Sequence, residues 1–227
     1  MKVRYLHDWQ ITPAQAKQIQ LDLASMVSRR SEISTVTLVA GVDISGSDDR
    51  ELAQAAVVVL SFPQLVLLET QVLEQEIDFP YIPGLLSFRE SPLIQAVCKK
   101  LTVEPDLILV DGQGIAHPRR IGLASHLGLL WDKPTIGCAK SRLCGVHQAV
   151  PAEIGSYSNI IDNEEIIGAA LRTRQGANPI YVSIGHKTDL QTAISWAMSC
   201  CNGYRLPEPT RLAHLAASGH RTQNAMA

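Results

Sequence analysis

Short runs of apolar residues, separated by polar and glycine-containing segments, predict a sheet with helices between its strands. A continuous apolar run of about four to eight residues is typical of a buried strand, and apolar residues three and four positions apart indicate a helix. Strands are expected over residues 37–44, 55–60, 65–73, 107–110 and 134–138, with strand-like pieces at 166–171 and 179–184. Helices are expected over 13–29, from 87 or 91 to 101, over 119–131 and 188–200, and after the prolines at 207 and 209.

Local signals set several of these boundaries. Residues 12–15, Thr-Pro-Ala-Gln, predict an N-cap with a capping box. Residues 188–191, Thr-Asp-Leu-Gln, predict the capped start of another helix. Residues 87–90 and 91–92 offer two overlapping starts for one helix. The three residues 62–64 between the second and third strands are few enough for a hairpin.

The order of the elements predicts an α/β fold with a mixed sheet flanked by helices. Three antiparallel strands followed by right-handed α-β crossovers resemble the ribonuclease H-like fold, in which the fourth strand lies parallel to the first and beside it. Neither a repeat nor a linker interrupts the chain, so one domain over residues 1–227 is expected. The last roughly ten residues are expected to form a disordered tail.

Composition narrows the class of protein only modestly. A formal net charge of −2 excludes a strongly basic, non-specific nucleic-acid coater but leaves room for an enzyme with a local basic patch. No apolar run is long enough to span a membrane, and the N-terminus lacks the apolar core of a signal peptide, so a cytoplasmic protein without a membrane partner is expected. The five cysteines form no Cys-x-x-Cys pair, which favours reduced thiols. Cys138, Cys144 and His147 could in principle bind a metal, but a fourth ligand is missing.

Two aspartates occupy places where chemistry is expected. Asp43 lies inside the first apolar run, and Asp111 directly follows the run 107–110, at the strand end where open α/β sheets bind ligands. Buried carboxylates are unfavourable without a cation, and neither strand carries lysine or arginine. Oxygen ligands suit Mg²⁺ or Mn²⁺, and a phosphodiester is the natural substrate of such a site. The competing interpretations are a strand-end aspartate for Asp43 and an ordinary Asp-Gly turn at Asp111.

Other polar residues have two interpretations each on local sequence. Glu90 is a catalytic acid or the glutamate of a capping box, and Lys140 is a site residue or a solvated loop lysine. His214 is a ligand or a packed or surface histidine. Arg119 and Arg120 are expected to begin a helix, where they position phosphates or fix the glycine loop through nearby acids.

Four longer motifs cover Phe79–Glu90, Asp111–Arg120, Pro134–Ser141 and Tyr204–His214. In their order and spacing they resemble the endonuclease V family. The resemblance extends from about residue 12 to 216 and is weakest over 149–180. It implies a metal-dependent DNA repair endonuclease with a ribonuclease H-like fold. Such an enzyme recognises deoxyinosine and hydrolyses the second phosphodiester 3′ to it, leaving 3′-hydroxyl and 5′-phosphate ends.

The resemblance also implies roles for individual residues. Asp43 and Asp111 would bind Mg²⁺, with Mn²⁺ expected to substitute, and Glu90 and His214 would complete the acidic centre. Lys140 would contact the scissile phosphate or the attacking water. These five residues form the expected catalytic set.

A wedge and a base pocket are further implications of the resemblance. Tyr81, held between two prolines, would fill the gap left by a flipped base, although an aromatic residue pinned on a surface loop is the alternative. Flipping is least unfavourable where the base is already poorly paired. Glycines would let backbone groups approach the base. The expected lesion-binding residues are Pro80, Tyr81, Ile82, Pro83, Gly84, Leu85, Gly112 and His117.

The expected partner is deoxyinosine-containing DNA, duplex or single-stranded, bound by a monomer. One alternative is an endoribonuclease acting on inosine-containing RNA, which would differ by its contacts with 2′-hydroxyl groups. Another alternative is a non-catalytic nucleic-acid-binding protein of the same fold. The four competent residues at the acidic centre disfavour that second alternative.

Overall fold

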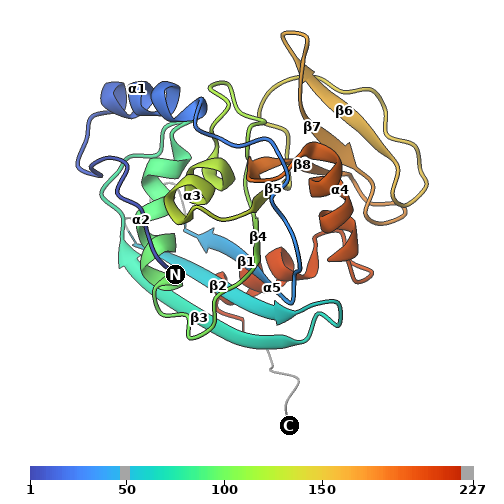
Figure 1. The fold of residues 1–227 in the computed structure, drawn as a ribbon, viewed down its shortest axis with the longest axis horizontal. Coiled ribbons are helices and arrows are strands. Elements are labelled where there is room, and N and C mark those ends of the chain that lie inside the picture. The colour runs from blue at the N-terminus through green and yellow to red at the C-terminus, as the bar shows by residue number, and fades with distance from the viewer. Residues whose placement is uncertain (47–51, 221–227) are drawn as a thin grey trace.

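A mixed sheet lies at the centre of the computed structural model, which describes residues 1–46 and 52–220 of the chain (Figure 1). In this described part the sheet has eight strands in the order β3-β2-β1-β4-β5-β8-β7-β6. The strands are β1 (Leu38–Ser45), β2 (Leu52–Ser61), β3 (Leu67–Glu76), β4 (Leu107–Val110), β5 (Thr135–Ala139), β6 (Tyr157–Asp162), β7 (Glu165–Leu171) and β8 (Ile180–His186). The helices are α1 (Pro13–Ala24), α2 (Leu86–Cys98), α3 (Leu123–Trp131), α4 (Leu190–Ser199) and α5 (Glu208–Ala217).

The strand pairing confirms the ribonuclease H-like α/β fold. β1, β2 and β3 form an antiparallel meander, whereas β4 pairs in parallel with β1 and β5 pairs in parallel with β4. Beyond β5 the sheet continues with β8, β7 and β6, all antiparallel. The sequence signalled β7 and β8 but not β6, because this edge strand is largely exposed and lacks an apolar run.

Helices cover both faces of the sheet because successive residues of each buried strand point to opposite sides. Leu107 and Leu109 of β4 share a core with α4 and α5. Ile108 and Val110 of the same strand share the other core with α2 and α3. A strand buried on both faces reads as a continuous apolar run, which explains why β4 was recognisable in the sequence.

Helix α5 packs unusually close to β1. A Cβ atom built on Gly41 would lie 2.0 Å from the carbonyl oxygen of Pro209, so only glycine fits at this crossing. Helix α5 begins directly after Pro207 and packs against β1, the strand that carries Asp43. The close crossing therefore positions the polar residues of α5 beside the acids of the sheet.

Several helix boundaries differ from the predicted ones. The capping box at Thr12 is present, but α1 ends at Ala24 rather than near residue 29. Helix α3 begins at Leu123 and not at residue 119, because Arg120 adopts a left-handed conformation with φ 57° that cannot continue a helix. Helix α4 is capped by Asp189, whose carboxylate accepts from the Thr192 amide at 2.8 Å, instead of by Thr188.

The start of α2 resolves an alternative left open by the sequence. This helix begins at Leu86, its N-cap Leu85 makes no side-chain capping bond, and Pro92 lies inside it. The capping-box interpretation of Ser87 and Glu90 is therefore wrong. Glu90 lies in the second turn of α2 and is free for another role.

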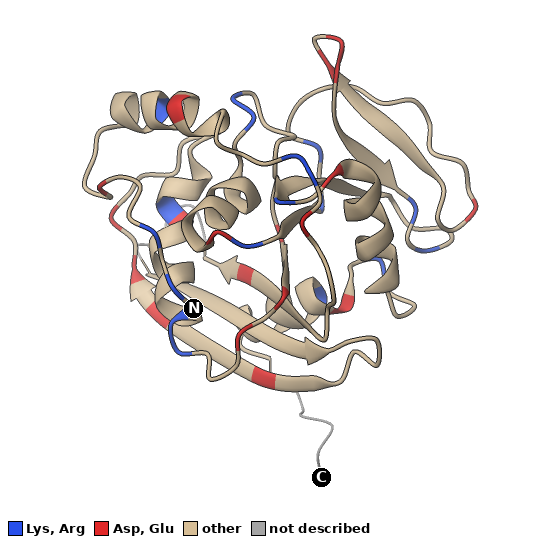
Figure 2. Ribbon diagram, in the orientation of Figure 1, with Lys and Arg blue, Asp and Glu red and all other residues tan. Residues whose placement is uncertain are grey.

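Neither sign of charge is confined to one part of the ribbon in the view of Figure 2. Figure 2 shows basic positions interspersed with acidic ones over the described part of the ribbon. Within residues 1–46 and 52–220, no helix is both long enough and apolar enough to cross a membrane. The expected disordered tail falls largely on residues 221–227, which lie outside the described residues.

Candidate active site

Asp43 and Asp111 lie side by side at the ends of neighbouring parallel strands. The β1–β4 register pairs Val42 with Val110, and the next residue of each strand is the aspartate. The Asp111 amide donates to the Val42 carbonyl at 3.0 Å and continues the pairing by one step. The expected neighbourhood of the two acids is thus present, and neither aspartate belongs to an isolated turn.

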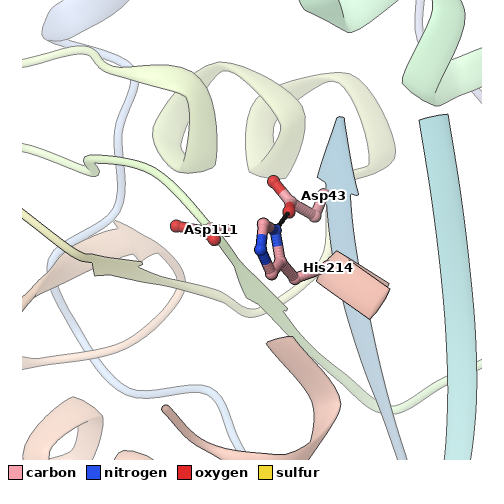
Figure 3. A group of neighbouring side chains, drawn as sticks. All are labelled: Asp43, Asp111 and His214. Atoms are coloured by element: carbon pink, nitrogen blue, oxygen red, sulfur yellow. Dashed lines mark hydrogen bonds and ion pairs between the residues drawn. The ribbon is translucent and has the colours of Figure 1, made fainter. Parts of the chain in front are cut away.

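His214 of α5 completes a three-residue group with the two aspartates. Its Nδ1 atom lies 2.7 Å from Oδ2 of Asp43, and Figure 3 shows the two side chains reaching toward each other with Asp111 beside them. One potential ligand atom from each residue lies within 4.8 Å of those of the other two. The His214 side chain is 44% exposed and that of Asp43 only 8%, so the group is open on one side.

Lys140 is part of the same group and is not a solvated loop lysine. Its Nζ atom lies 2.6 Å from Oδ2 of Asp111, 4.0 Å from Oδ2 of Asp43 and 3.2 Å from Nδ1 of His214. The residue directly follows β5, which is the parallel neighbour of β4. Arg205 fixes its backbone, since the Arg205 Nη2 atom donates to the Lys140 carbonyl at 2.6 Å.

Burial and mutual repulsion make Asp43 and Glu90 hard to ionise in the absence of a cation. Burial, together with the nearby charge of Asp111, raises the pKa of Asp43 from 3.8 to about 6, against the opposing effect of Lys140 and His214. Burial raises the pKa of Glu90 well above its usual value of 4.5, and the charges of Asp43 and Asp111 raise it further. Glu90 thus belongs to the same electrostatic group, although it is not one of the three residues whose ligand atoms cluster.

The donor set fits a divalent cation that prefers oxygen ligands. Oδ2 of Asp111 is buried, accepts no hydrogen bond, and has the Lys140 ammonium as its close charged neighbour. Two carboxylates and one imidazole match the ligands that Mg²⁺ or Mn²⁺ prefers better than they match those of a thiolate-rich zinc site. Among the described residues no second group of three potential ligands occurs, so Cys138, Cys144 and His147 do not form one.

A cavity of about 350 Å³ adjoins the acidic group and has Asp111 and Lys140 in its wall. Its volume lies in the range of about 300–1,000 Å³ that is usual for small-ligand pockets. The expected lesion-binding residues in its wall are Tyr81, Ile82, Pro83, Gly84, Gly112 and His117. Tyr81 is 48% exposed. Leu85 does not line this cavity but is fully buried beside Phe88, and Pro80 lines a separate cavity with Phe79 and Phe88.

The carbonyl oxygen of Gly84 anchors the loop that carries Tyr81. It accepts from Nη2 of Arg119 at 2.7 Å, from Nε2 of Gln20 at 3.0 Å, and from Nε2 of His117 at 3.0 Å. The Arg119 amide donates to Nδ1 of His117, so the hydrogen of this imidazole is on Nε2. Burial, with Arg119 nearby, lowers the pKa of His117 to about 4 and keeps the ring neutral.

Sequence reasoning missed Gln20, although a signal was present. Gln20 is four residues after Ala16 and three before Leu23, on the buried face of α1. A polar residue on an otherwise apolar helix face needs buried partners. Gln20 finds them in Gly84, Ile121 and Arg119.

The two arginines expected at a helix start hold loops together instead. Arg119 contacts Gln20 and Gly84, as described above. Nη2 of Arg120 lies 2.9 Å from Oδ2 of Asp162, and its Nε lies 2.6 Å from Oε2 of Glu165. The β6–β7 hairpin is thereby fastened to the loop after β4, which agrees with the alternative that local acids fix this loop.

Comparisons with known proteins agree with this geometry. The family model described as Endonuclease V matches residues 21–215. Endonuclease V of Dehalococcoides mccartyi is 51% identical over 218 residues, which make up 96% of this chain and 98% of the relative.

Solved structures give the same result. Endonuclease V of Bacillus subtilis has a TM-score of 0.91 at 35% identity, with 96% of each chain covered. Ciona intestinalis endonuclease V, solved with a 24mer DNA containing an inosine followed by a ribo-adenosine, has a TM-score of 0.80 at 31% identity. That match covers 91% of this chain and 95% of the relative. The extent of these matches shows that this chain belongs to the endonuclease V family of nucleases.

Proposed function

We propose that this nuclease repairs DNA by recognising deoxyinosine and hydrolysing the second phosphodiester 3′ to the lesion, which leaves 3′-hydroxyl and 5′-phosphate ends. The observation that carries the proposal is the junction of a cation-binding group with a base-sized cavity: Asp111 belongs to both, and Lys140 beside it also lines the cavity. The Ciona relative bound to inosine-containing DNA supports the choice of lesion. We propose a single-domain enzyme that acts as a monomer, since the proposed site needs no residue from a second subunit.

Asp43, Asp111 and His214 are the residues that would hold the divalent cation, which we propose to be Mg²⁺ with Mn²⁺ as a substitute. When bound, such an ion neutralises charge on the phosphodiester and lowers the pKa of water. Glu90 of α2 belongs to the same electrostatic group, and a bound cation would favour its ionised form against burial and the charges of Asp43 and Asp111. The proposed acidic centre therefore consists of these four residues.

Lys140 is proposed to bind the scissile phosphate. Its ammonium lies 2.6 Å from Asp111 and 4.0 Å from Asp43, and the residue lines the cavity. A lysine offers three donors and a full positive charge to phosphate oxygens. The Arg205 bond to its backbone keeps the lysine at the end of β5. Phosphate binding would draw the ammonium away from Asp111, whose buried Oδ2 would then be available to the cation.

The loop 79–85 is proposed to separate the damaged base from its partner. Tyr81 is exposed on this loop and can stack in the gap, while the flipped base enters the cavity lined by Gly84, Gly112 and His117. Three donors fix the Gly84 carbonyl, so the loop is held in place before DNA binds. Preorganisation of this kind lowers the entropy lost on binding.

Cleavage of matched substrates tests the proposal. End-labelled oligonucleotides that contain inosine or adenine at one position would be incubated with the enzyme in Mg²⁺, in Mn²⁺ and in EDTA. We expect a nick two bonds 3′ to inosine with either metal and none in EDTA, and we expect Asp111→Asn to bind DNA without cutting it. Cleavage in EDTA, or equal cleavage of the adenine control, would contradict the proposal.

One observation supports a ribonuclease activity as the second candidate function. The nucleic acid bound to the Ciona relative carries a ribo-adenosine directly after the inosine. Inosine in an RNA strand of the same sequence is therefore the natural third substrate in the experiment. A higher kcat/KM for RNA than for DNA would favour the endoribonuclease alternative.

A further inference from the structure

A chain of hydrogen bonds runs from the N-terminal segment to the wall of the cavity. Ser87, in the first turn of α2, lines the cavity, and its Oγ lies 3.1 Å from Nδ1 of His126 in α3. Nε2 of His126 lies 2.7 Å from Nε2 of His7. Nδ1 of His7 in turn lies 2.7 Å from the backbone carbonyl oxygen of Asp8. None of these residues belongs to the proposed catalytic or metal-binding set.

The position of each hydrogen in this series of hydrogen bonds follows from the bond between His7 and the Asp8 carbonyl. A carbonyl oxygen can only accept, so Nδ1 of His7 carries the hydrogen and Nε2 of the neutral ring is an acceptor. Nε2 of His126 must then be the donor, which leaves its Nδ1 as an acceptor. The hydroxyl of Ser87 therefore donates its hydrogen to His126.

Burial keeps both rings neutral, as this arrangement requires. His126 is fully buried, and this burial together with the adjacent His7 lowers its pKa to about 3. Burial also lowers the pKa of His7, against the opposing effect of the Asp8 carbonyl. Trp9 and Phe88 pack against the rings, with centroids 4.5 Å from His7 and 5.1 Å from His126 respectively, and so restrict their orientation.

The consequence concerns which hydrogen-bonding groups the cavity offers. Ser87 is only 2% exposed but lines the cavity, and with its hydrogen committed to His126 its Oγ keeps lone pairs that can accept a hydrogen bond. Hypoxanthine carries a hydrogen on N1, whereas N1 of adenine is a bare acceptor. We propose that the His7–His126 pair fixes Ser87 as an acceptor in the pocket and makes it a specificity-determining residue for purines that carry a hydrogen on N1. This inference rests on the proposed function, since it assumes that the flipped purine enters this cavity.

A purine with a bare N1 meets an unfavourable choice at this serine. Either two acceptors face each other, or the hydroxyl turns its hydrogen to the base and leaves the buried Nδ1 of His126 without a partner. A hypoxanthine avoids both outcomes. The net value of one neutral hydrogen bond corresponds to a preference of roughly three- to tenfold, in addition to other contacts of the base.

The test reverses the direction of the hydrogen-bond chain. His7→Lys places a side chain that can only donate next to Nε2 of His126, so His126 must move its hydrogen to Nδ1 and the Ser87 hydroxyl turns toward the cavity. His7→Gln is the matched control, because its amide oxygen still accepts from His126. The readout is the ratio of kcat/KM for deoxyinosine to that for deoxynebularine, whose N1 is bare, in single-stranded oligonucleotides.

We expect the ratio to fall roughly three- to tenfold in His7→Lys and to stay at the wild-type value in His7→Gln. In a Ser87→Ala background, His7→Lys should no longer change the ratio, an effect that general loosening of the N-terminal segment would not produce. Thermal unfolding identifies any variant that fails to fold. An unchanged ratio in folded His7→Lys, or an equal fall in the Ser87→Ala background, would overturn the inference. Failure of the wild-type enzyme to cut deoxyinosine would instead overturn the proposed function.

Discussion

The isosteric substitution Asp43→Asn should stabilise the metal-free protein while it abolishes metal-dependent cleavage. Asp43 is buried beside Asp111, and without a cation its ionised form is disfavoured by burial and by the second negative charge. An asparagine oxygen can still accept the hydrogen bond from His214, but it carries no charge. A substitution in the active site is therefore expected to raise stability, as is common where function needs a strained site.

The size of the effect follows from the pKa of Asp43. The folded protein holds this proton up to about pH 6 and the unfolded chain only to 3.8, so the folded state binds more protons between these values. Stability of the metal-free protein consequently falls as the pH rises through this window. The pKa of Asp43 differs by about two between the folded and unfolded states, and one pKa unit corresponds to about 1.36 kcal/mol. The ionised aspartate therefore lowers the free energy of unfolding by about 3 kcal/mol at neutral pH. For a chain of this size that corresponds to a Tm increase of up to about 10 °C in the variant.

Thermal unfolding in EDTA at pH 8 and at pH 4 measures this prediction. The variant should melt higher than the wild type at pH 8, and the gap should shrink greatly at pH 4, where Asp43 is protonated in the folded state and the pH lies close to its unfolded pKa of 3.8. Added Mg²⁺ should raise the Tm of the wild type by mass action and leave the variant largely unchanged. An Asp43→Asn protein that melts lower than the wild type in EDTA at pH 8 would refute the reasoning.

Asp106→Asn is the matched control of opposite sign. Burial acts to raise the pKa of Asp106, but the hydrogen bonds that it accepts from the amides of Thr37 and Leu38 outweigh burial and lower it. Its ionised form therefore stabilises the fold above the usual carboxyl pKa. The same chemical change at this position should lower the Tm at pH 8.

Two further predictions concern the wedge and the crossing of α5. Tyr81→Ala should reduce the preference for inosine over adenine roughly tenfold, because stacking is worth about 1–3 kcal/mol per base. Tyr81→Phe keeps an aromatic ring and should keep the preference. Cleavage assays in which the alanine variant is as selective as the wild type would exclude the wedge role. Gly41→Ala should destabilise the protein by about 1–3 kcal/mol or more in denaturant unfolding, since its Cβ would lie 2.0 Å from the Pro209 carbonyl oxygen. A variant as stable as the wild type would show that α5 can move away from β1.

The sequence predicted the central part of the fold because its strands are buried on both faces. The run at β4 is continuous and apolar, and Asp111 directly after it marks a strand end. The same reasoning failed at the start of α3, where the apolar periodicity extends into the preceding loop. In that loop Arg120 has a left-handed backbone conformation and forms ion pairs with Asp162 and Glu165. Contacts with a distant hairpin decide that boundary, and local periodicity carries no information about them.

For the candidate site, the sequence by itself singled out two acidic residues and showed where along the strands they lie. Asp43 and Asp111 stand out because a charged residue interrupts or ends an apolar run, and the element order predicted that they would be neighbours. Only the tertiary structure placed Lys140 at 2.6 Å from Asp111 and His214 at 2.7 Å from Asp43.

The tertiary structure alone also decided how the pocket is held and which groups it offers. Gln20 and His126 look like single polar residues on apolar helices, and their roles depend on partners that are 64 and 119 positions away. The physical reason is that a buried polar group must find a hydrogen-bond partner, but any segment of the chain can supply it. Periodicity fixes which face of a helix is buried, and only three-dimensional packing selects the partner on the other side.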